Sequence, residues 1–155
     1  QPMRKTGNYL KNCRLWTGTS YGFNDHPLID VLIIAGGVHA DEMSKPPVME
    51  WIYHQSKNAS VTASVCTGTF LLAKAKVLKN HGVTTHWEDV ADLRSAFPQL
   101  SVVENVRWVD EGEVVTSGGI SAGIDMSLHL VSRLHSKELA ERTARQMDFS
   151  WEKNS

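Results

Sequence analysis

The sequence lacks the features that define several protein classes. It has only two cysteines, Cys13 and Cys66, among 155 residues, so it is not a disulfide scaffold, and we expect a reducing, cytoplasmic setting. No apolar run approaches the length of a membrane span, so no membrane association is expected. Neither charge dominates: 16 basic and 17 acidic side chains give a formal net charge of −1. Nucleic acid is therefore not an expected partner.

Motifs for metals and dinucleotides are missing as well. The cysteines and the seven histidines form no CxxC or HxxxH pattern, so we expect no metal site. Gly36-Gly37 and Gly118-Gly119 do not form the GxGxxG fingerprint, so we expect no dinucleotide and no other cofactor. The chain length and its 41% hydrophobic content are those of one ordinary globular domain over residues 1–155.

What the sequence does contain is an alternation of strand and helix patterns. The run 30–35 is continuously apolar and closed by glycines, which is typical of a parallel strand buried on both faces. Further strands are expected over 61–66 and 83–86, and a hairpin around 110–112. Helices are expected over 46–58, 70–78, 87–97, 124–134 and 137–147. The alternation predicts an α/β fold: a flavodoxin-like three-layer sandwich with a mainly parallel sheet and a small antiparallel hairpin.

Cys66 is the residue with the clearest chemical potential. It directly follows an apolar strand and directly precedes a helix, with the small residues Ser64 and Gly68 on either side. A side chain on such a strand-to-helix turn stands exposed above the sheet, as in a nucleophile elbow. The following helix start favours a thiolate, and the N–H groups of Thr67 and Gly37 could form an oxyanion hole. The alternative is a small, buried, apolar cysteine that ends a strand.

His86 closes another short strand pattern. If the two strand ends are adjacent, its imidazole could orient or deprotonate Cys66. The alternative is a surface histidine, or a buried one whose hydrogen bonds are satisfied locally.

Four segments in order resemble one protein family. They are 30–37 (DVLIIAGG), 64–68 (SVCTG), 84–87 (TTHW) and 115–125 (VTSGGISAGID). Together they are similar to the ThiJ/PfpI superfamily, within the class I glutamine amidotransferase-like fold. The nearest branches are isonitrile hydratases and the amidase-like sensor domains of AraC-type regulators. The resemblance covers residues 22–151.

The resemblance implies roles for individual residues. Cys66 would be the nucleophile with His86 near its thiol, and Thr67 and the Gly36-Gly37 turn would supply oxyanion and substrate contacts. The loop 117–123, which includes Ser121, would close the pocket wall, and its helix would help to form a homodimer. Trp87 would be a packing residue or a pocket-side aromatic.

Two departures from the family pattern bear on these roles. Ala35 stands where the family usually has proline. The family also begins with a further strand, helix and strand, which carry an acid beside the cysteine that no residue here matches. We therefore expect either that the chain is N-terminally incomplete, or that residues 1–30 and a dimer partner cover the exposed sheet edge.

Three functions follow from this resemblance. The first is a cysteine-dependent enzyme, in which Cys66 adds to a small electrophile in a hydratase or amidase reaction. The second is a catalytically idle ligand-sensing domain, as in AraC-type regulators, where a helix-turn-helix part follows the domain. The third is an oxidation-sensing protective protein, because an exposed thiolate is readily oxidised. In the first two cases the partner is a small molecule.

Overall fold

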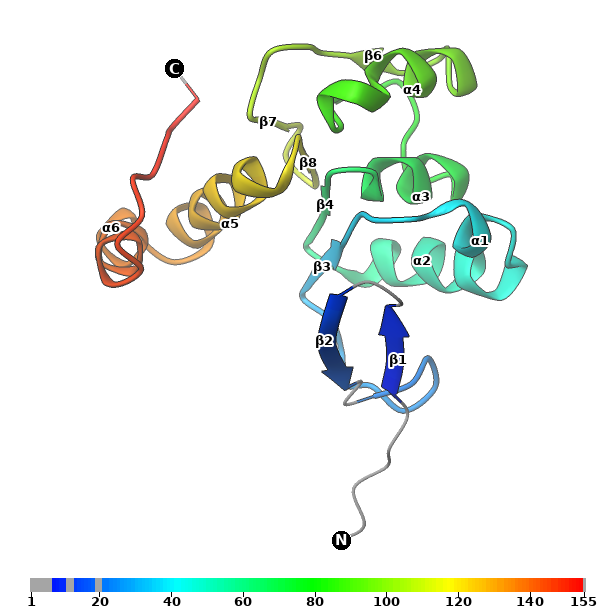
Figure 1. Ribbon diagram of the computed structural model, residues 1–155, viewed down its shortest axis with the longest axis horizontal. Helices are drawn as coiled ribbons and strands as arrows, with labels where there is room; N and C mark the ends of the chain where they lie inside the picture. The colour runs from blue at the N-terminus through cyan, green and yellow to red at the C-terminus, as the bar shows by residue number, and fades with distance from the viewer. Residues whose placement is uncertain (1–6, 11–12, 19–20, 155) are drawn as a thin grey trace, which may run out of the picture.

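A four-stranded sheet forms the centre of the computed structural model, which describes residues 7–10, 13–18 and 21–154. Its strand order is β3-β4-β8-β7, with β3, β4 and β8 parallel and β7 antiparallel to β8 (Figure 1). The strands are β3 (Val31–Ile34), β4 (Val61–Val65), β7 (Trp108–Asp110) and β8 (Val114–Ser117). The continuous apolar runs thus form the parallel strands, and the expected hairpin is the β7–β8 pair.

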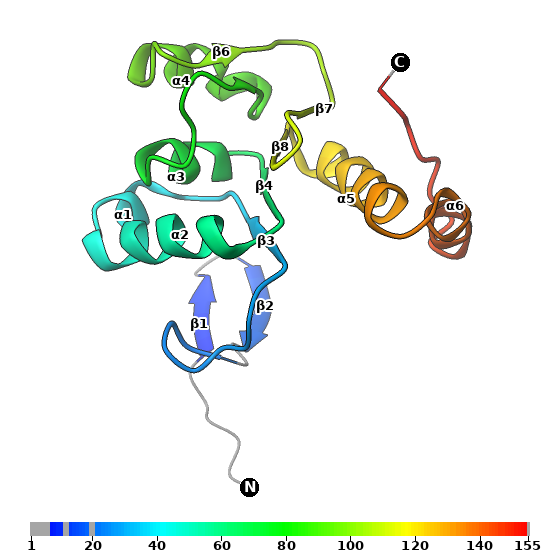
Figure 2. The same ribbon diagram turned by 180° about the vertical axis from the view of Figure 1, so that it is seen from behind.

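Helices cover both faces of this sheet, and two small strand pairs lie outside it (Figure 2). The helices are α1 (Ala40–Met43), α2 (Pro46–Asn58), α3 (Gly68–Lys74), the single 3-10 turn η1 (Trp87–Asp89), α4 (Val90–Ala96), α5 (Ile120–Leu134) and α6 (Lys137–Gln146). The small pairs are β1 (Gly7–Leu10) with β2 (Cys13–Gly18), which is antiparallel, and β5 (Gly82–Val83) with β6 (Ser101–Val102), which is parallel. The α/β fold with a mainly parallel sheet is confirmed.

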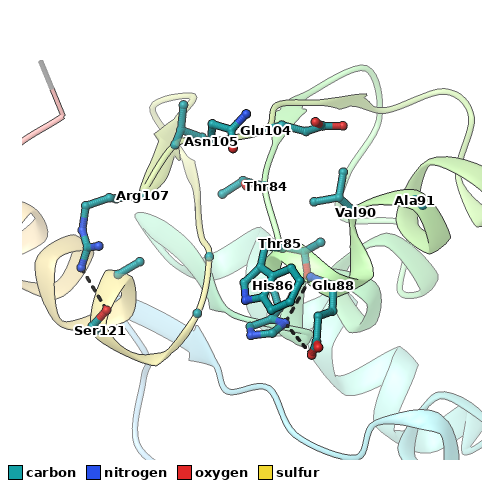
Figure 3. Close-up of a pocket in the computed structure, with 15 residues that line it drawn as sticks. Thr84, Thr85, His86, Glu88, Val90, Ala91, Glu104, Asn105, Arg107 and Ser121 are labelled. Atoms are coloured by element: carbon teal, nitrogen blue, oxygen red, sulfur yellow. Dashed lines mark hydrogen bonds and ion pairs between the residues drawn. The ribbon is translucent and has the colours of Figure 1, made fainter.

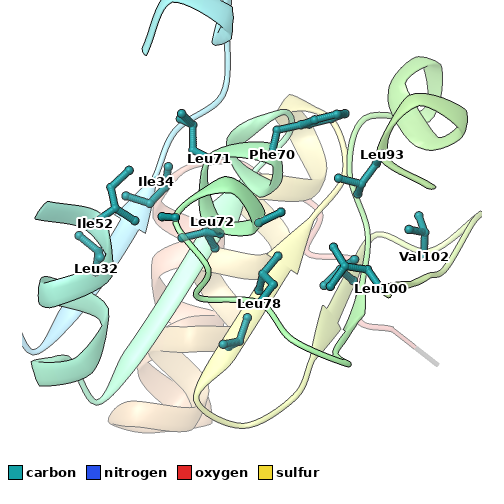
Figure 4. Packing of buried hydrophobic residues seen from close by; sticks show 14 of the residues in the cluster. Leu32, Ile34, Ile52, Phe70, Leu71, Leu72, Leu78, Leu93, Leu100 and Val102 are labelled. Atoms are coloured by element: carbon teal, nitrogen blue, oxygen red, sulfur yellow. The ribbon is translucent and has the colours of Figure 1, made fainter. Parts of the chain in front are cut away.

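Alternation along the strands sends side chains to two separate cores. Leu32 and Ile34 point to one face, where they pack with Ile52 of α2 and the apolar residues of α3 (Figure 4). Ala63 of β4 points to the other face and packs with Met126 of α5. Each face therefore buries its own helical layer, as a three-layer sandwich requires. No helix in the described part of the chain is long and apolar enough to cross a membrane.

Several elements differ from the sequence expectation. The helix expected over 124–134 begins at Ile120, and the helix expected over 87–97 divides into η1 and α4. The helix expected over 70–78 ends at Lys74, because the chain turns at Lys76, whose φ of +62° is incompatible with a continuing helix. The strand expected over 83–86 ends at Val83 and pairs with β6 outside the main sheet. Thr84 leaves the strand pattern because its N–H donates to the Thr116 hydroxyl instead of to a strand partner.

β3 lies at the edge of the four-stranded sheet as described, and Ile33 on it is 48% exposed. The prediction that the run 30–35 is buried on both faces is therefore wrong for this strand, because no further strand of the described residues pairs with its outer edge. β1 and β2 form their own sheet rather than extending this one. The side chain of Cys13 and residues 1–6, 11–12, 19–20 and 155 lie outside what the structure describes. The expectations of a missing N-terminal part, of a single domain over 1–155 and of a homodimer remain predictions.

Candidate functional site

Cys66 sits on a strained turn between β4 and α3. Its φ is +57°, in the left-handed region that non-glycine residues seldom occupy. The residue is partly exposed, and its N–H is shared between the carbonyl oxygens of Ser117 (3.0 Å) and Gly118 (2.9 Å). Strand β4 thus ends beside β8, and the backbone turns sharply into α3. This is the nucleophile-elbow geometry that the sequence predicts.

Two glycines allow the backbone to approach this turn. A Cβ on Gly68 would lie 2.2 Å from the carbonyl oxygen of Ile34. A Cβ on Gly36 would lie 2.7 Å from the Val65 carbonyl oxygen and 2.9 Å from the Cys66 Cβ. The end of β3 is therefore in direct contact with the elbow, and only glycine fits at either position.

Buried hydroxyl groups hold the elbow from below. Thr85 Oγ1 donates to the Cys66 carbonyl (3.0 Å), and Thr69 Oγ1 donates to the Thr84 carbonyl (2.9 Å). Thr69 Oγ1 also lies 2.8 Å from Ser64 Oγ, which leaves Ser64 as the donor of that bond. Hydroxyl groups thus connect β4, α3 and β8 with the loop after β5. The hydroxyl-bearing residues of this network, each at most 2% exposed, are Ser64, Thr69, Thr84, Thr85, Thr116 and Ser117.

Thr67 and Gly37 are joined to each other above the elbow. The Thr67 hydroxyl accepts from the Gly37 N–H (2.9 Å) and donates to the Gly37 carbonyl (2.9 Å). The Gly37 N–H, expected as an oxyanion donor, therefore already has a partner in this structure. A substrate oxygen would have to displace the Thr67 hydroxyl to reach it.

A cavity of about 610 Å³ opens beside the elbow. Figure 3 shows Arg107 and Ser121 on one wall and His86 and Glu88 on the other. The structure thus brings His86 and Ser121 to one cavity. The other expected site residues, Gly36, Gly37, Cys66 and Thr67, do not line it. Further lining residues come from the loop after β6 and the start of α4: Val90, Ala91, Glu104, Asn105 and Val106.

His86 faces acidic neighbours with one nitrogen. Its Nδ1 accepts from the Glu88 N–H (3.4 Å) and lies 3.6 Å from the carboxylates of both Glu88 and Asp89. The opposite ring edge faces Gly119, where a Cβ would lie 3.3 Å from His86 Cδ2. Among residues 21–154 the Cys66 thiol makes no hydrogen bond, to His86 or to a carboxylate, so their pairing stays a prediction. Trp87 lines the cavity and is 76% exposed, which makes it a pocket-side residue and not a packing one.

Sequence reasoning missed the ion pair behind the cavity wall. Arg107 Nε donates to Asp125 Oδ2 (2.5 Å), and its Nη2 also contacts this carboxylate. Asp125 is fully buried, and its Oδ1 accepts from the Glu152 N–H (2.8 Å). A buried acid on an otherwise apolar helix face is the signal that could have revealed it, because such a charge requires a partner.

A second polar cluster joins β7 to α5 away from the elbow. Asp110 contacts His129 Nε2 (2.6 Å) and Arg133 Nη1 (2.7 Å) and accepts from the Gly112 N–H (2.8 Å). Partial burial raises the pKa of Asp110, but the bonds from His129, Gly112 and Arg133 outweigh it and hold that pKa below its usual range. In the described residues no group of three or more metal-binding side chains occurs.

The fold and the elbow define a class of protein: an α/β sandwich with a cysteine on the turn that follows a central parallel strand. The sequence profile of the DJ-1/PfpI family matches residues 20–133 of this chain. The chain belongs to the DJ-1/PfpI family.

The relatives with curated names include a transcriptional regulator and an enzyme. The chain is 31% identical to the HTH-type transcriptional regulator GbdR of Pseudomonas aeruginosa over 77% of its own length and 32% of the regulator. It is 33% identical to an isonitrile hydratase of Pseudomonas putida over 83% of its length and 55% of that protein. The chain thus spans about a third of the regulator and about half of the hydratase.

A solved structure confirms the fold. The ThiJ/PfpI family protein from Pseudomonas syringae superposes with a TM-score of 0.79 at 24% identity. The match covers 91% of this chain and 58% of the other.

Proposed function

We propose that this chain is a small-molecule-binding domain of the kind found in transcriptional regulators. The observation that carries the proposal is the 610 Å³ cavity beside the elbow, which Cys66 does not line. A volume of this size is in the range of ligand pockets. A cysteine nucleophile also needs a base or acid within hydrogen-bond reach, and the thiol has no hydrogen-bonded partner among residues 21–154.

The proposal is tested by blocking the cavity without disturbing the core. Ala91 lines the cavity and is exposed on α4, whereas Ala96 is exposed on the same helix but does not line it. Thermal unfolding is measured with a panel of short carboxylates, amines and neutral amides. A compound present at one hundred times its dissociation constant stabilises the folded state by about 2.7 kcal/mol. We expect such a saturable rise in Tm, lost in Ala91→Trp and kept in Ala96→Trp.

The outcome that contradicts the proposal is equally clear. If no compound gives a saturable rise, or if both tryptophan variants respond as the parent does, the cavity is not a ligand site.

A second function, cysteine-dependent hydration, is favoured by the strained φ of Cys66. Strain of about 1–3 kcal/mol persists where the surrounding structure fixes it, and it is typical of active sites. For an isonitrile, the Cys66 sulfur would add to the terminal carbon, and the same carbon would take up the thiol proton. The resulting thioimidate would add water and release the N-substituted formamide with return of the thiol, so that one isonitrile and one water give one formamide.

This second function is tested with cyclohexyl isocyanide, and formamide formation is followed by NMR. We expect Cys66→Ser to abolish turnover and the parent chain to react with iodoacetamide faster at Cys66 than at Cys13. A parent chain with no turnover and with a slow Cys66 leaves only the binding function.

A further inference from the structure

One wall of the cavity carries a concentration of hydrogen-bond donors. Arg107, with its side chain 31% exposed, lines this wall together with Ser121. The Nη2 group of Arg107 donates to Ser121 Oγ (3.1 Å), as Figure 3 shows. Arg107 directly precedes β7 and Ser121 lies in the first turn of α5, so two separate elements fix the relative position of the two side chains.

The Arg107 guanidinium keeps N–H donors that the described part of the chain does not pair. Its Nε and Nη2 contact Asp125, which fixes the plane of the group. Among residues 21–154 its Nη1 group has no hydrogen-bond partner, which leaves two N–H donors free on a side chain that is 31% exposed. A guanidinium held on one side by a buried carboxylate is preorganised to accept a second carboxylate on the other.

The start of α5 adds to the same wall. Gly118, Gly119, Ser121 and Ala122 all line the cavity, and no side chain caps the first turn of this 15-residue helix. The positive end of the helix therefore faces the space into which Arg107 opens. This end alone would not define a site, but it favours the same sign of charge as the guanidinium.

The acidic residues of the cavity do not cancel this preference. Glu104 forms an ion pair with Arg94. Glu88 lies beside His86 on the facing wall. Glu152 approaches Arg107 Nε to 3.5 Å but is 67% exposed, so solvent weakens its effect.

We propose that the ligand of this cavity is a small molecule with a carboxylate group, which binds Arg107 Nη1 with support from Ser121. The proposal rests on the proposed binding function and names the chemical class of its ligand. Binding at Arg107 should also affect the C-terminal segment. Arg107 donates to the Asp125 carboxylate, and the same carboxylate accepts from the Glu152 N–H. The backbone carbonyl of Asp125 accepts from the Trp151 indole at 3.2 Å. Occupancy of the cavity is thus reported at Trp151, which does not line it.

The test compares acetate and propionate with their neutral amides, acetamide and propionamide. Titrations are run on the full chain at constant ionic strength in chloride and followed by NMR, including the indole N–H resonance of Trp151, which Trp151→Phe assigns. We expect saturable shifts with the carboxylates, with the Trp151 resonance giving the same dissociation constant as the cavity residues, and no saturation with the amides.

Three variants should change the affinity for carboxylates, two of them downward and one upward. Arg107→Lys keeps a charge for Asp125 but loses the fork, and should weaken carboxylate binding about tenfold. Ser121→Ala, at an exposed position, should weaken it about threefold. Glu152→Gln removes a nearby negative charge and should tighten it about twofold. A general loss of structure cannot produce this tightening.

Each contrary result has a definite meaning. If acetate and acetamide bind equally well, or if Ser121→Ala and Glu152→Gln leave carboxylate affinity unchanged, the carboxylate assignment is wrong. The binding function survives that result if a neutral compound still loses affinity in Ala91→Trp. If nothing at all binds in the cavity, both proposals fail.

Discussion

The elbow around Cys66 and the cluster around Asp110 solve the same problem in different ways. Both join a strand of the central sheet to a neighbouring element. The elbow does so with neutral hydroxyl groups that are almost fully buried and paired with backbone groups. The Asp110 cluster uses a carboxylate, an imidazole and a guanidinium on side chains that are about a quarter exposed.

The difference shows where this molecule has little tolerance for change. A buried hydroxyl network has no solvent to replace a lost partner, so each removed group leaves another unpaired. An exposed ion pair is largely replaced by water and by dissolved ions. We therefore expect stability to depend strongly on the elbow and weakly on the Asp110 cluster.

The largest effect is expected at Gly68. Gly68→Ala places a methyl group 2.2 Å from the Ile34 carbonyl oxygen, a backbone atom that cannot rotate away. We expect the free energy of unfolding to fall by about 3–4 kcal/mol, although alanine is the better helix former. Urea denaturation measures this change. Gly118→Ala is the matched control, because its new Cβ meets no atom closer than 3.5 Å. Equal losses in the two variants would contradict the close-approach argument.

A smaller but clear effect is expected at Thr69. Thr69→Val keeps the shape of the side chain but removes the partner of Ser64 Oγ and of the Thr84 carbonyl. We expect a loss of about 2–3 kcal/mol in the free energy of unfolding. Thr69→Ser, which keeps the hydroxyl and loses one methyl group, should cost about 1 kcal/mol. If the serine variant is the less stable of the two, packing and not hydrogen bonding dominates beneath the elbow.

The smallest effect is expected at Asp110, and it depends on pH. Since the folded pKa of Asp110 is lowered, its contribution is present above the unfolded value of about 3.9 and is lost as pH falls through the folded value. We expect Asp110→Asn to reduce stability by about 0.5–1 kcal/mol at pH 7, with less effect in high salt.

The pH series supplies its own check. The difference between the parent and Asp110→Asn should shrink as pH falls below about 3.9. A difference that grows on acidification would show that the lowered pKa of Asp110 is not the cause.

The strands and the elbow could be predicted because local chemistry determines them. The apolar runs 31–34 and 61–65 form the parallel strands β3 and β4, and the order strand, Cys66, Gly68, helix leaves one way to turn the chain. The ends of the helices are harder to predict from the sequence. The end of α3 depends on the positive φ at Lys76, which no residue type in the sequence 74–78 signals.

The cavity wall could be predicted only in part, because it depends on distant residues. Arg107 and Asp125 are far apart in sequence, and their pairing follows from how β7 docks on α5, which no local pattern reveals. The sequence predicts His86 at the end of a strand. It instead caps η1, because the two threonines before it bond to Thr116 and to Cys66.

Among residues 21–154, the hydrogen-bonded side chains beneath Cys66 are serines and threonines, and none of them is ionisable. Acidification, added salt or the binding of a charged ligand therefore does not directly change the hydrogen bonds that hold the Cys66 turn. The charged wall formed by Arg107 and Asp125 can respond to its surroundings while the turn at Cys66 stays in place. Changes measured at the charged wall can thus be compared with the turn at Cys66 as a fixed internal reference.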